Sequence, residues 1–263
     1  MAQCARNGCR SWRPAVIARV AGLGYYLDDR WYCSVGCLEA AARARLATPQ
    51  GVEAVPRPSV PPLRLGVLLT QQSLVQPEGL KKALAQQAKT GLRLGALLVR
   101  SRAVSSADLL RGLAAQAGVP FLTTVDRGRL ASAPAGLARD AVRAMGLVPF
   151  EWKEAAEVIK VACTAPLPRT ALHAMRQLTG CRIDPYLVAD EMFPGLLEAY
   201  GAGRDDTAVC AVGDLGGTAS RIAAAARTAG ALRMTEARCD EQVWVRVEAP
   251  GRTEQLWLRS AAF

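Results

Sequence analysis

Several features that would mark an enzyme or a membrane protein are missing from this sequence. Its 263 residues include a single histidine, His173, and only 5% aromatic residues. The Gly-x-x-x-x-Gly-Lys-Ser/Thr string of a Walker A phosphate loop does not occur. No apolar run approaches the roughly 18–20 residues that a membrane-spanning helix needs. Residues 1–14 carry arginines with no apolar block after them, which is not the pattern of a secretory signal. We therefore predict a cytoplasmic protein that does not span a membrane.

Catalytic groups are also missing. The sequence pattern contains no nucleophile–histidine pair and no metal site with an open position. His173 lies in a predicted helix, where we interpret it as a packed or surface residue. With 51% hydrophobic and 21% charged residues, the chain has enough apolar side chains to bury a core. We predict a folded protein that is not an enzyme.

The net charge of +10 is concentrated toward the N-terminus. Residues 1–50 hold seven basic and three acidic groups, which gives +4, and residues 51–120 hold nine and three, which gives +6. The remaining residues balance. A localised positive field favours an anionic partner such as nucleic acid, a nucleotide or anionic lipid. A solvated basic surface is the alternative.

Four of the eight cysteines lie within the first 37 residues. Four residues separate Cys4 from Cys9, and three separate Cys33 from Cys37. Structural zinc prefers four thiolates in a tetrahedron, and Cys37 stands at the start of a predicted helix, whose N-terminus stabilises a thiolate. A segment of about 45 residues also needs a cross-link such as a bound metal ion, because its own hydrophobic core is too small to stabilise it. We predict a structural zinc ion on these cysteines, with free buried cysteines as the alternative.

The N-terminal segment resembles treble-clef zinc fingers with a CSxxC-like helix start, carried here by Cys33-Ser34-Val35-Gly36-Cys37. Such fingers bind nucleic acid or protein. Several of its side chains would contact phosphate and stack on bases, or form a solvated face: Arg6, Arg10, Trp12, Arg13 and Arg19. Nucleic-acid binding is therefore an alternative that we do not favour. The other cysteines stand singly and are interpreted as buried small side chains: Cys163, Cys181, Cys210 and Cys239.

Composition divides the chain into four parts, and the predicted fold class is α+β. Residues 1–47 form the small zinc finger, with strands expected at 16–20 and 25–27 and a helix from Ser34. Residues 48–62 contain five prolines, which predict a semi-rigid linker. Residues 63–203 hold a helical tandem-repeat subdomain and an α/β subdomain over 119–203. Residues 204–263 form a small α/β tail.

The sequence of the tail contains no recognisable catalytic or binding motif. We expect a strand at 207–212, a helix at 219–229, and strands from the alternation around Val243, Val245 and Val247 and at 255–258. Its glycines are interpreted as a turn before the helix rather than a phosphate loop: Gly213, Gly216 and Gly217.

An internal repeat is the most informative feature of the sequence. Residues 64–87 read RLGVLLTQQSLVQPEGLKKALAQQ and residues 93–116 read RLGALLVRSRAVSSADLLRGLAAQ, with ten identities in 24 positions. Each copy predicts a short helix, a turn and a longer helix, and two copies can pack about a pseudo-twofold axis. In each longer helix two leucines and a glutamine share one face at i, i+4 and i+7: Leu80, Leu84 and Gln87, and Leu109, Leu113 and Gln116.

An ordinary helical core explains the repeated leucines but not the repeated arginine, glycine and glutamine. A glycine beside the arginine indicates close approach of another group to the backbone. A glutamine at the end of an apolar stripe can bind a polar edge.

At these residues the sequence resembles the N-terminal domains of type II secretion and type IV pilus assembly ATPases of the GspE/MshE/PilB type. In that family, tandem 24-residue motifs separated by five residues form the cyclic di-GMP receptor called the MshEN domain. Three later stretches resemble the family's α/β subdomain: 119–122, 147–150, and 178–180 before a strand and a helix at 190–200. The resemblance covers about residues 63–203.

The resemblance implies a cyclic di-GMP-binding regulatory protein with a protein partner in a secretion, pilus or motility system. The arginines would bind guanine O6/N7 or a phosphate, the leucines would face the purines, and the glutamines would bond an edge of the ligand. The implied ligand-binding residues are Arg64, Leu65, Gly66, Leu80, Leu84, Gln87, Arg93, Leu94, Gly95, Leu109, Leu113 and Gln116. A nucleotide-independent docking adaptor is the competing function.

Two features depart from the family. Its usual glycine at the tenth motif position is replaced by Ser73 and Arg102, which would crowd the turn, or in the case of Arg102 add a phosphate contact. The motor domain that follows in the family is not in this sequence, so we expect a sensor module rather than a motor.

Overall fold

The structure, a computed structural model, describes residues 2–14, 23–47, 63–126, 130, 137, 139–201, 215–239, 242–250 and 252–259. Several predictions fall outside these residues: the strands at 16–20 and 207–212, the linker at 48–62, Arg19, Cys210 and Gly213. The described chain mixes helices and sheets, which confirms the predicted α+β class. Within these ranges, no helix has the length and apolar character needed to cross a membrane.

The tandem repeat folds as predicted into two short and two longer helices. The first copy forms α3 (Leu65–Gln71) and α4 (Pro77–Thr90), and the second forms α5 (Leu94–Arg100) and α6 (Ser106–Ala117). Pro77 occupies the first turn of α4, and the Ser105 side chain caps α6 by accepting from the Asp108 N–H. The helices share a small core: Leu69, Val75, Ala83, Leu97, Leu98 and Val104.

The two copies are interlocked, because α4 lies against α5 and α6 lies against α3. A Cβ on Gly112 of α6 would come within 2.5 Å of a Leu69 methyl group in α3, so these helices cross closely. The equivalent residue in the first copy is Ala83, which is buried in α4. This exchange of partners agrees with the approximate two-fold relation that the repeat predicts.

The α/β subdomain follows the tandem helices. Its elements are α7 (Arg139–Met145), β5 (Val148–Lys153), the 3-10 turn η2 (Glu154–Ala156), β6 (Val158–Cys163), α8 (Arg169–Thr179), β7 (Arg182–Leu187) and α9 (Phe193–Gly201). The sheet order is β5-β6-β7, with β5 antiparallel and β7 parallel to β6. Leu110 and Ala114 of α6 are buried in the core of this subdomain. The helix α6 therefore belongs to both the tandem repeat and the α/β subdomain.

The two ends of the chain build one sheet of five strands, ordered β10-β9-β8-β3-β4. The N-terminal part supplies β3 (Tyr25–Leu27) and β4 (Arg30–Tyr32), and the C-terminal part supplies β8 (Ala231–Cys239), β9 (Gln242–Ala249) and β10 (Arg252–Arg259). The two parts meet where β3 pairs in parallel with β8. The finger-like segment and the tail, which the sequence presents as separate, therefore share this terminal sheet.

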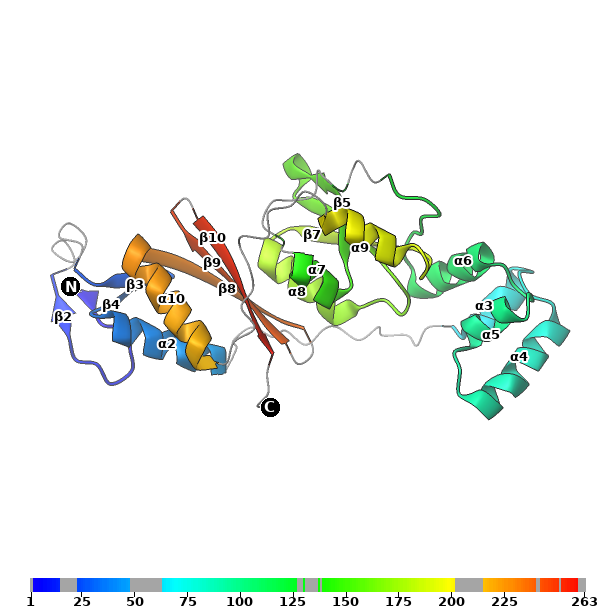
Figure 1. Ribbon diagram of the computed structural model, residues 1–263, viewed down its shortest axis with the longest axis horizontal. Coiled ribbons are helices and arrows are strands. Elements are labelled where there is room, and N and C mark those ends of the chain that lie inside the picture. Colours follow the sequence, from blue (N-terminus) through cyan, green and yellow to red (C-terminus); the bar gives the residue numbers. More distant parts are fainter. Residues whose placement is uncertain are drawn as a thin grey trace.

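Two helices cover one face of the terminal sheet and bury a single core with it. They are α2 (Val35–Ala47) from the N-terminal part and α10 (Leu215–Ala229) from the C-terminal part, and they lie side by side (Figure 1). Leu38 and Leu46 of α2 are in the same buried cluster as Ile222 of α10 and Val245 of β9. The predicted helices from Ser34 and over 219–229 are both confirmed.

The other face of the terminal sheet packs against the α/β subdomain. Val243 and Val245 of β9 face α2 and α10, whereas Trp244 lies in the core that includes α8. On the same side as Trp244, the Arg246 Nη1 donates to the Leu178 carbonyl at 3.0 Å. The period-two pattern of this strand is therefore confirmed, with both of its faces covered.

A cluster of charged side chains joins the two ends of the chain. Arg45 of α2 forms ion pairs with Asp28, in the turn after β3, and with Glu236 of β8. Its Nη2 also donates to the Met234 carbonyl at 2.9 Å, and the Met234 N–H donates to Asp28 Oδ1 at 2.8 Å. Burial raises the pKa of Glu236, against the opposing effect of Arg45. Arg45 therefore connects α2, the β3–β4 turn and β8.

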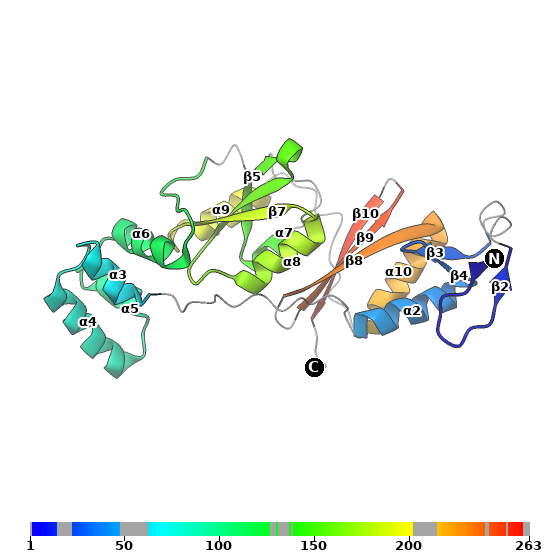
Figure 2. The same ribbon diagram turned by 180° about the vertical axis from the view of Figure 1, so that it is seen from behind.

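The parts lie along one axis. Figure 1 shows the tandem helices at one end, the N-terminal strands at the other, and the α/β subdomain between the tandem helices and the terminal sheet. Figure 2 shows the same order from behind. The candidate ligand site on the tandem helices and the four N-terminal cysteines are therefore far apart.

Candidate ligand site and candidate metal centre

The turns of the two motifs have the same hydrogen bonds. In the first copy the Ser73 N–H donates to the Thr70 carbonyl and the Leu74 N–H donates to the Leu69 carbonyl, at 3.0 and 2.8 Å. In the second copy the equivalent bonds start from Arg102 and Ala103 and are both 2.9 Å long. This pair of bonds is the Schellman ending of a helix, which usually has glycine at its left-handed position.

Ser73 and Arg102 occupy those left-handed positions, with φ of 56° and 57°. The backbone therefore keeps the turn that the usual glycine would favour, at a steric cost of about 1–2 kcal/mol for each non-glycine residue. Both side chains are exposed and do not fill the turn.

The motif glycines are approached by a leucine of their own copy. A Cβ on Gly66 would lie 3.1 Å from a methyl group of Leu80, and one on Gly95 would lie 3.1 Å from a methyl group of Leu109. The predicted close approach to the backbone is therefore present, and the approaching group is a side chain of the longer helix. These glycines set how closely each short helix meets the longer one.

The two motif arginines are exposed at the start of the short helices. Arg64 is the N-cap residue of α3 and Arg93 is the N-cap residue of α5, with nearly identical backbone angles. Neither side chain has an ion pair or hydrogen bond to another residue of the described ranges. Both guanidinium groups are therefore available to an anion or to a polar edge.

The motif glutamines bond the backbone just before an arginine. The Gln87 Nε2 donates to the Leu92 carbonyl at 3.1 Å, and the Gln116 Nε2 donates to the Leu63 carbonyl at 2.6 Å. Leu92 precedes Arg93 and Leu63 precedes Arg64. Each glutamine therefore anchors the start of the other motif, a connection that the spacing alone did not predict.

The motif leucines differ in exposure between the two copies. Leu84 is 46% exposed on α4, whereas its equivalent Leu113 on α6 packs against the core of the α/β subdomain. Leu63 and Leu92 are also largely exposed, at 57% and 41%. An exposed leucine therefore precedes each exposed arginine in the chain, Leu63 before Arg64 and Leu92 before Arg93. The other predicted leucines are half-buried in or beside the tandem core: Leu65, Leu80, Leu94 and Leu109.

The four predicted cysteines converge. Their Sγ atoms all lie within 4.8 Å of one another. The separations are 3.7 Å between Cys9 and Cys33, 3.6 Å between Cys33 and Cys37, and 4.0 Å between Cys37 and Cys9. Four sulfurs at about 2.3 Å from a tetrahedral zinc ion are about 3.8 Å apart. The three separations among Cys9, Cys33 and Cys37 therefore match a zinc ion held by four cysteines, and the sulfur of the fourth, Cys4, lies within 4.8 Å of each.

Local structure explains how the cysteines are placed. The segment between β1 (Ala2–Gln3) and β2 (Trp12–Arg13) carries Cys4 and Cys9, while Cys33 follows β4. Cys37 lies in the first turn of α2, where its N–H donates to the Ser34 hydroxyl at 3.2 Å. A strand hairpin and a capped helix start thus bring together residues that are far apart in the segment.

The environment favours thiolate at two of the cysteines. Hydrogen bonds with Ser11 lower the pKa of Cys9 to about 6, and the bond with the Ser11 backbone has the largest effect. The hydrogen bond with Ser34 lowers the pKa of Cys37, with a further contribution from Arg6, whose Nη1 lies 3.7 Å from the sulfur. Burial instead raises the pKa of Cys33 to about 11. A bound cation would supply the charge that favours the Cys33 thiolate.

The remaining predicted residues take no part in either site. Cys163 and Cys239 are buried, as predicted, whereas Cys181 is half-buried. His173 lies in α8 and is partly covered. Trp12 is 60% exposed on β2, between the exposed Arg10 and Arg13.

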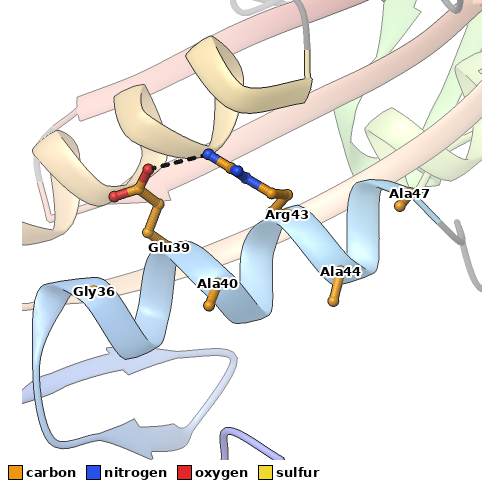
Figure 3. Close-up of a pocket in the computed structure, with 6 residues that line it drawn as sticks. All are labelled: Gly36, Glu39, Ala40, Arg43, Ala44 and Ala47. Carbon is orange, nitrogen blue, oxygen red and sulfur yellow. Dashed lines mark ion pairs between the residues drawn. The ribbon is translucent and has the colours of Figure 1, made fainter.

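A shallow hollow of about 420 Å³ lies along the outer face of α2 (Figure 3). Small side chains line it, with Glu39 and Arg43 paired at 3.7 Å beside them. All of its lining residues come from this single helix. The hollow brings together no chemical groups from different elements, so we assign it no site.

Comparison with known proteins gives matches only among solved structures, since no family model and no curated protein matches the chain. The structure of MshE with cdg is 24% identical over 52% of this chain and 98% of its own, with a TM-score of 0.42. The N-terminal domain of XpsE is 20% identical over 52% of this chain and 93% of its own, with a TM-score of 0.37.

Proposed function

We propose that this protein is a non-enzymatic, cytoplasmic receptor for cyclic di-GMP, with the tandem helices as its binding site. The ligand is two-fold symmetric, with two guanines and two phosphates. The site offers two equivalent sets of groups, each with an arginine, a glutamine and leucines. A pseudo-symmetric site can therefore give each half of the ligand the same environment.

The observation that carries the proposal is the matching exposure of Arg64 and Arg93 at the starts of equivalent helices. A helical core does not need two exposed arginines, each preceded by an exposed leucine, that pair with no other described residue. A guanidinium can bind guanine O6 and N7, or a phosphate, through two parallel hydrogen bonds. Each such contact contributes roughly 1–3 kcal/mol of discrimination.

Calorimetric titration with cyclic di-GMP tests this function. Arg64→Ala and Arg93→Ala should each weaken binding by about tenfold or more, on the basis of that contact energy, at an unchanged melting temperature. Arg100→Ala is the matched control, because Arg100 is also exposed on α5 but has a glutamine as its equivalent in the first copy. Absence of binding heat in the wild-type protein would instead favour the nucleotide-independent adaptor for a secretion, pilus or motility system.

We further propose that the four N-terminal cysteines hold a structural zinc ion. The matching sulfur separations and the lowered pKa values of Cys9 and Cys37 support this assignment. Zinc would cross-link the β1–β2 hairpin to the start of α2. Four cysteine ligands complete the coordination of the ion, which leaves no open position for catalysis.

Metal analysis of protein expressed with ample zinc tests the assignment. We expect one equivalent per chain, lost in Cys33→Ser and retained in Cys181→Ser, which changes a half-buried cysteine outside the cluster. Less than half an equivalent in the wild-type protein would contradict the zinc centre.

A further inference from the structure

The guanidinium group of Arg6 lies against the cysteine cluster. The sequence leaves the role of this arginine open between a phosphate contact and a solvated face. In the structure, its Nη1 is 3.7 Å from the Cys37 sulfur, which is within reach of an N–H···S hydrogen bond. The two residues are 31 positions apart in the chain. Among the described residues, Arg6 is the one charged side chain that bonds a sulfur atom of the cluster.

The backbone on both sides of Arg6 is held by hydrogen bonds. The Ala5 N–H donates to the Trp31 carbonyl of β4 at 2.9 Å. The Arg6 carbonyl accepts from the Cys9 N–H at 3.1 Å. The turn that brings Cys9 to the cluster therefore also fixes the point from which the Arg6 side chain starts.

The charge of the proposed metal centre favours a cation at this place. Four thiolates and one divalent ion together carry two negative charges, and Cys4 and Cys37 are each only 6% exposed. Removing such charge from water is unfavourable unless cations or hydrogen bonds offset the loss of hydration. A guanidinium group offers both, because it keeps its positive charge and donates N–H groups. Arg6 itself is exposed, so its own desolvation costs little.

We propose that Arg6 is a positioning residue of the zinc centre, whose guanidinium donates to the Cys37 thiolate, raises the affinity for zinc and lowers the reactivity of that sulfur. This inference rests on the proposed zinc ion. The contact also joins the two pairs of ligands, because Arg6 lies between Cys4 and Cys9 in the chain and its partner sulfur belongs to the pair at the start of α2. Loss of an outer-shell partner typically weakens metal binding 10–100-fold.

Competition with a zinc chelator measures the affinity of the full chain. Arg6→Met keeps most of the length of the side chain and removes the guanidinium group. Because Arg6 is exposed, we expect a loss at the lower end of that range, about tenfold. Arg6→Lys keeps the charge and should recover most of the loss. Arg10→Met is the matched control and should bind zinc as the wild-type protein does, since Arg10 is exposed in the same segment and bonds no sulfur of the cluster among the described residues.

The absorption spectrum of the Co2+-substituted protein reports on the sulfur atoms themselves. Co2+ bound by thiolates has a sulfur-to-metal charge-transfer band, and a hydrogen bond to a thiolate lowers the energy of its lone pairs. The band should therefore move to lower energy in Arg6→Met and keep its position in Arg10→Met. A role of Arg6 in folding alone would not move this band.

Alkylation by iodoacetamide at saturating zinc tests the reactivity of Cys37. The thiolate sulfur forms a bond to the CH2 carbon of the reagent and iodide leaves. A thiolate that accepts a hydrogen bond is a weaker nucleophile, because its basicity is lower. The initial rate at Cys37, mapped by mass spectrometry, should be several-fold higher in Arg6→Met than in the wild-type protein or in Arg10→Met.

The outcomes separate this inference from the proposed zinc centre. If the wild-type protein binds neither zinc nor Co2+, the zinc centre and the role of Arg6 both fail. If it binds the metal and Arg6→Met matches Arg10→Met in affinity, spectrum and alkylation rate, the zinc centre stands and the role of Arg6 is overturned. A loss of affinity with an unchanged charge-transfer band would overturn it as well.

Discussion

The tandem repeat and the terminal sheet are assembled in opposite ways. In the repeat, the contacting residues belong to two neighbouring copies, and the same contacts occur twice. In the terminal sheet, Tyr26 of β3 lies opposite Ala231 of β8, so the contacts join the two ends of the chain. In the repeat, each contact therefore has an equivalent in the other copy with which it can be compared. In the terminal sheet, each contact between the two ends of the chain occurs once.

The largest expected effect is the loss of the proposed zinc ion. Because the finger-like segment shares its core with α10 and β8–β10, removing zinc should destabilise the C-terminal strands as well. Structural zinc binding contributes roughly 10–16 kcal/mol in small zinc-finger peptides. We therefore expect Cys37→Ser or chelation to abolish amide protection in β8 and β9, measured by hydrogen exchange.

Cys181→Ser is the control for that experiment, and it should retain the protection. If zinc loss alters only residues 2–47 and leaves β8 and β9 protected, the two ends of the chain are independent units. That result would contradict the dependence of the C-terminal strands on the finger-like segment.

A smaller loss is expected from the ion cluster that joins the ends. Arg45→Met leaves Glu236, whose side chain is 4% exposed, without its cation. Removing one partner of a buried ion pair typically costs 3–5 kcal/mol, and the partial exposure of Arg45 lowers our expectation to about 2–3 kcal/mol. The free energy of unfolding from urea titration measures it.

Arg43→Met provides the matched comparison on the same helix. Arg43 pairs with Glu39 at the surface, where such pairs contribute about 0.3–0.5 kcal/mol. Equal effects of the two substitutions would contradict the linking role of Arg45.

The smallest expected effect is a gain of stability in the repeat. Ser73→Gly and Arg102→Gly should each stabilise the protein by about 1 kcal/mol, because glycine adopts the left-handed backbone without the steric cost of a side chain. Gln72→Gly, one residue earlier at φ of −85°, should destabilise it. Thermal unfolding distinguishes these outcomes, and a loss of stability in both left-handed variants would contradict the assigned strain.

Sequence could predict the repeat and the cysteine cluster because their signals are local. Spacing placed Leu80, Leu84 and Gln87 on one helix face, and the structure confirms the helix. Four cysteines in a short segment predicted a shared metal site, and therefore that their sulfur atoms lie close together. In each case, the residues that meet are close in the chain or are marked by rare side chains.

The sequence contains no comparable local pattern that would indicate the parallel pairing of β3 with β8. Short strands such as Tyr25–Leu27 carry too few residues to specify a distant partner, and backbone hydrogen bonds do not depend on side-chain identity. The crossed glutamine contacts were missed for a related reason. Gln116 bonds a carbonyl group, which every residue has, so no residue type at position 63 indicates the contact.

The most direct test of the receptor function is the stoichiometry of cyclic di-GMP binding, measured by calorimetry on the full chain. Two equivalent sets of groups facing one two-fold ligand predict one ligand per chain, with binding weakened to a similar degree by Arg64→Ala and by Arg93→Ala. A titration without heat, or binding that is indifferent to both substitutions, would contradict it.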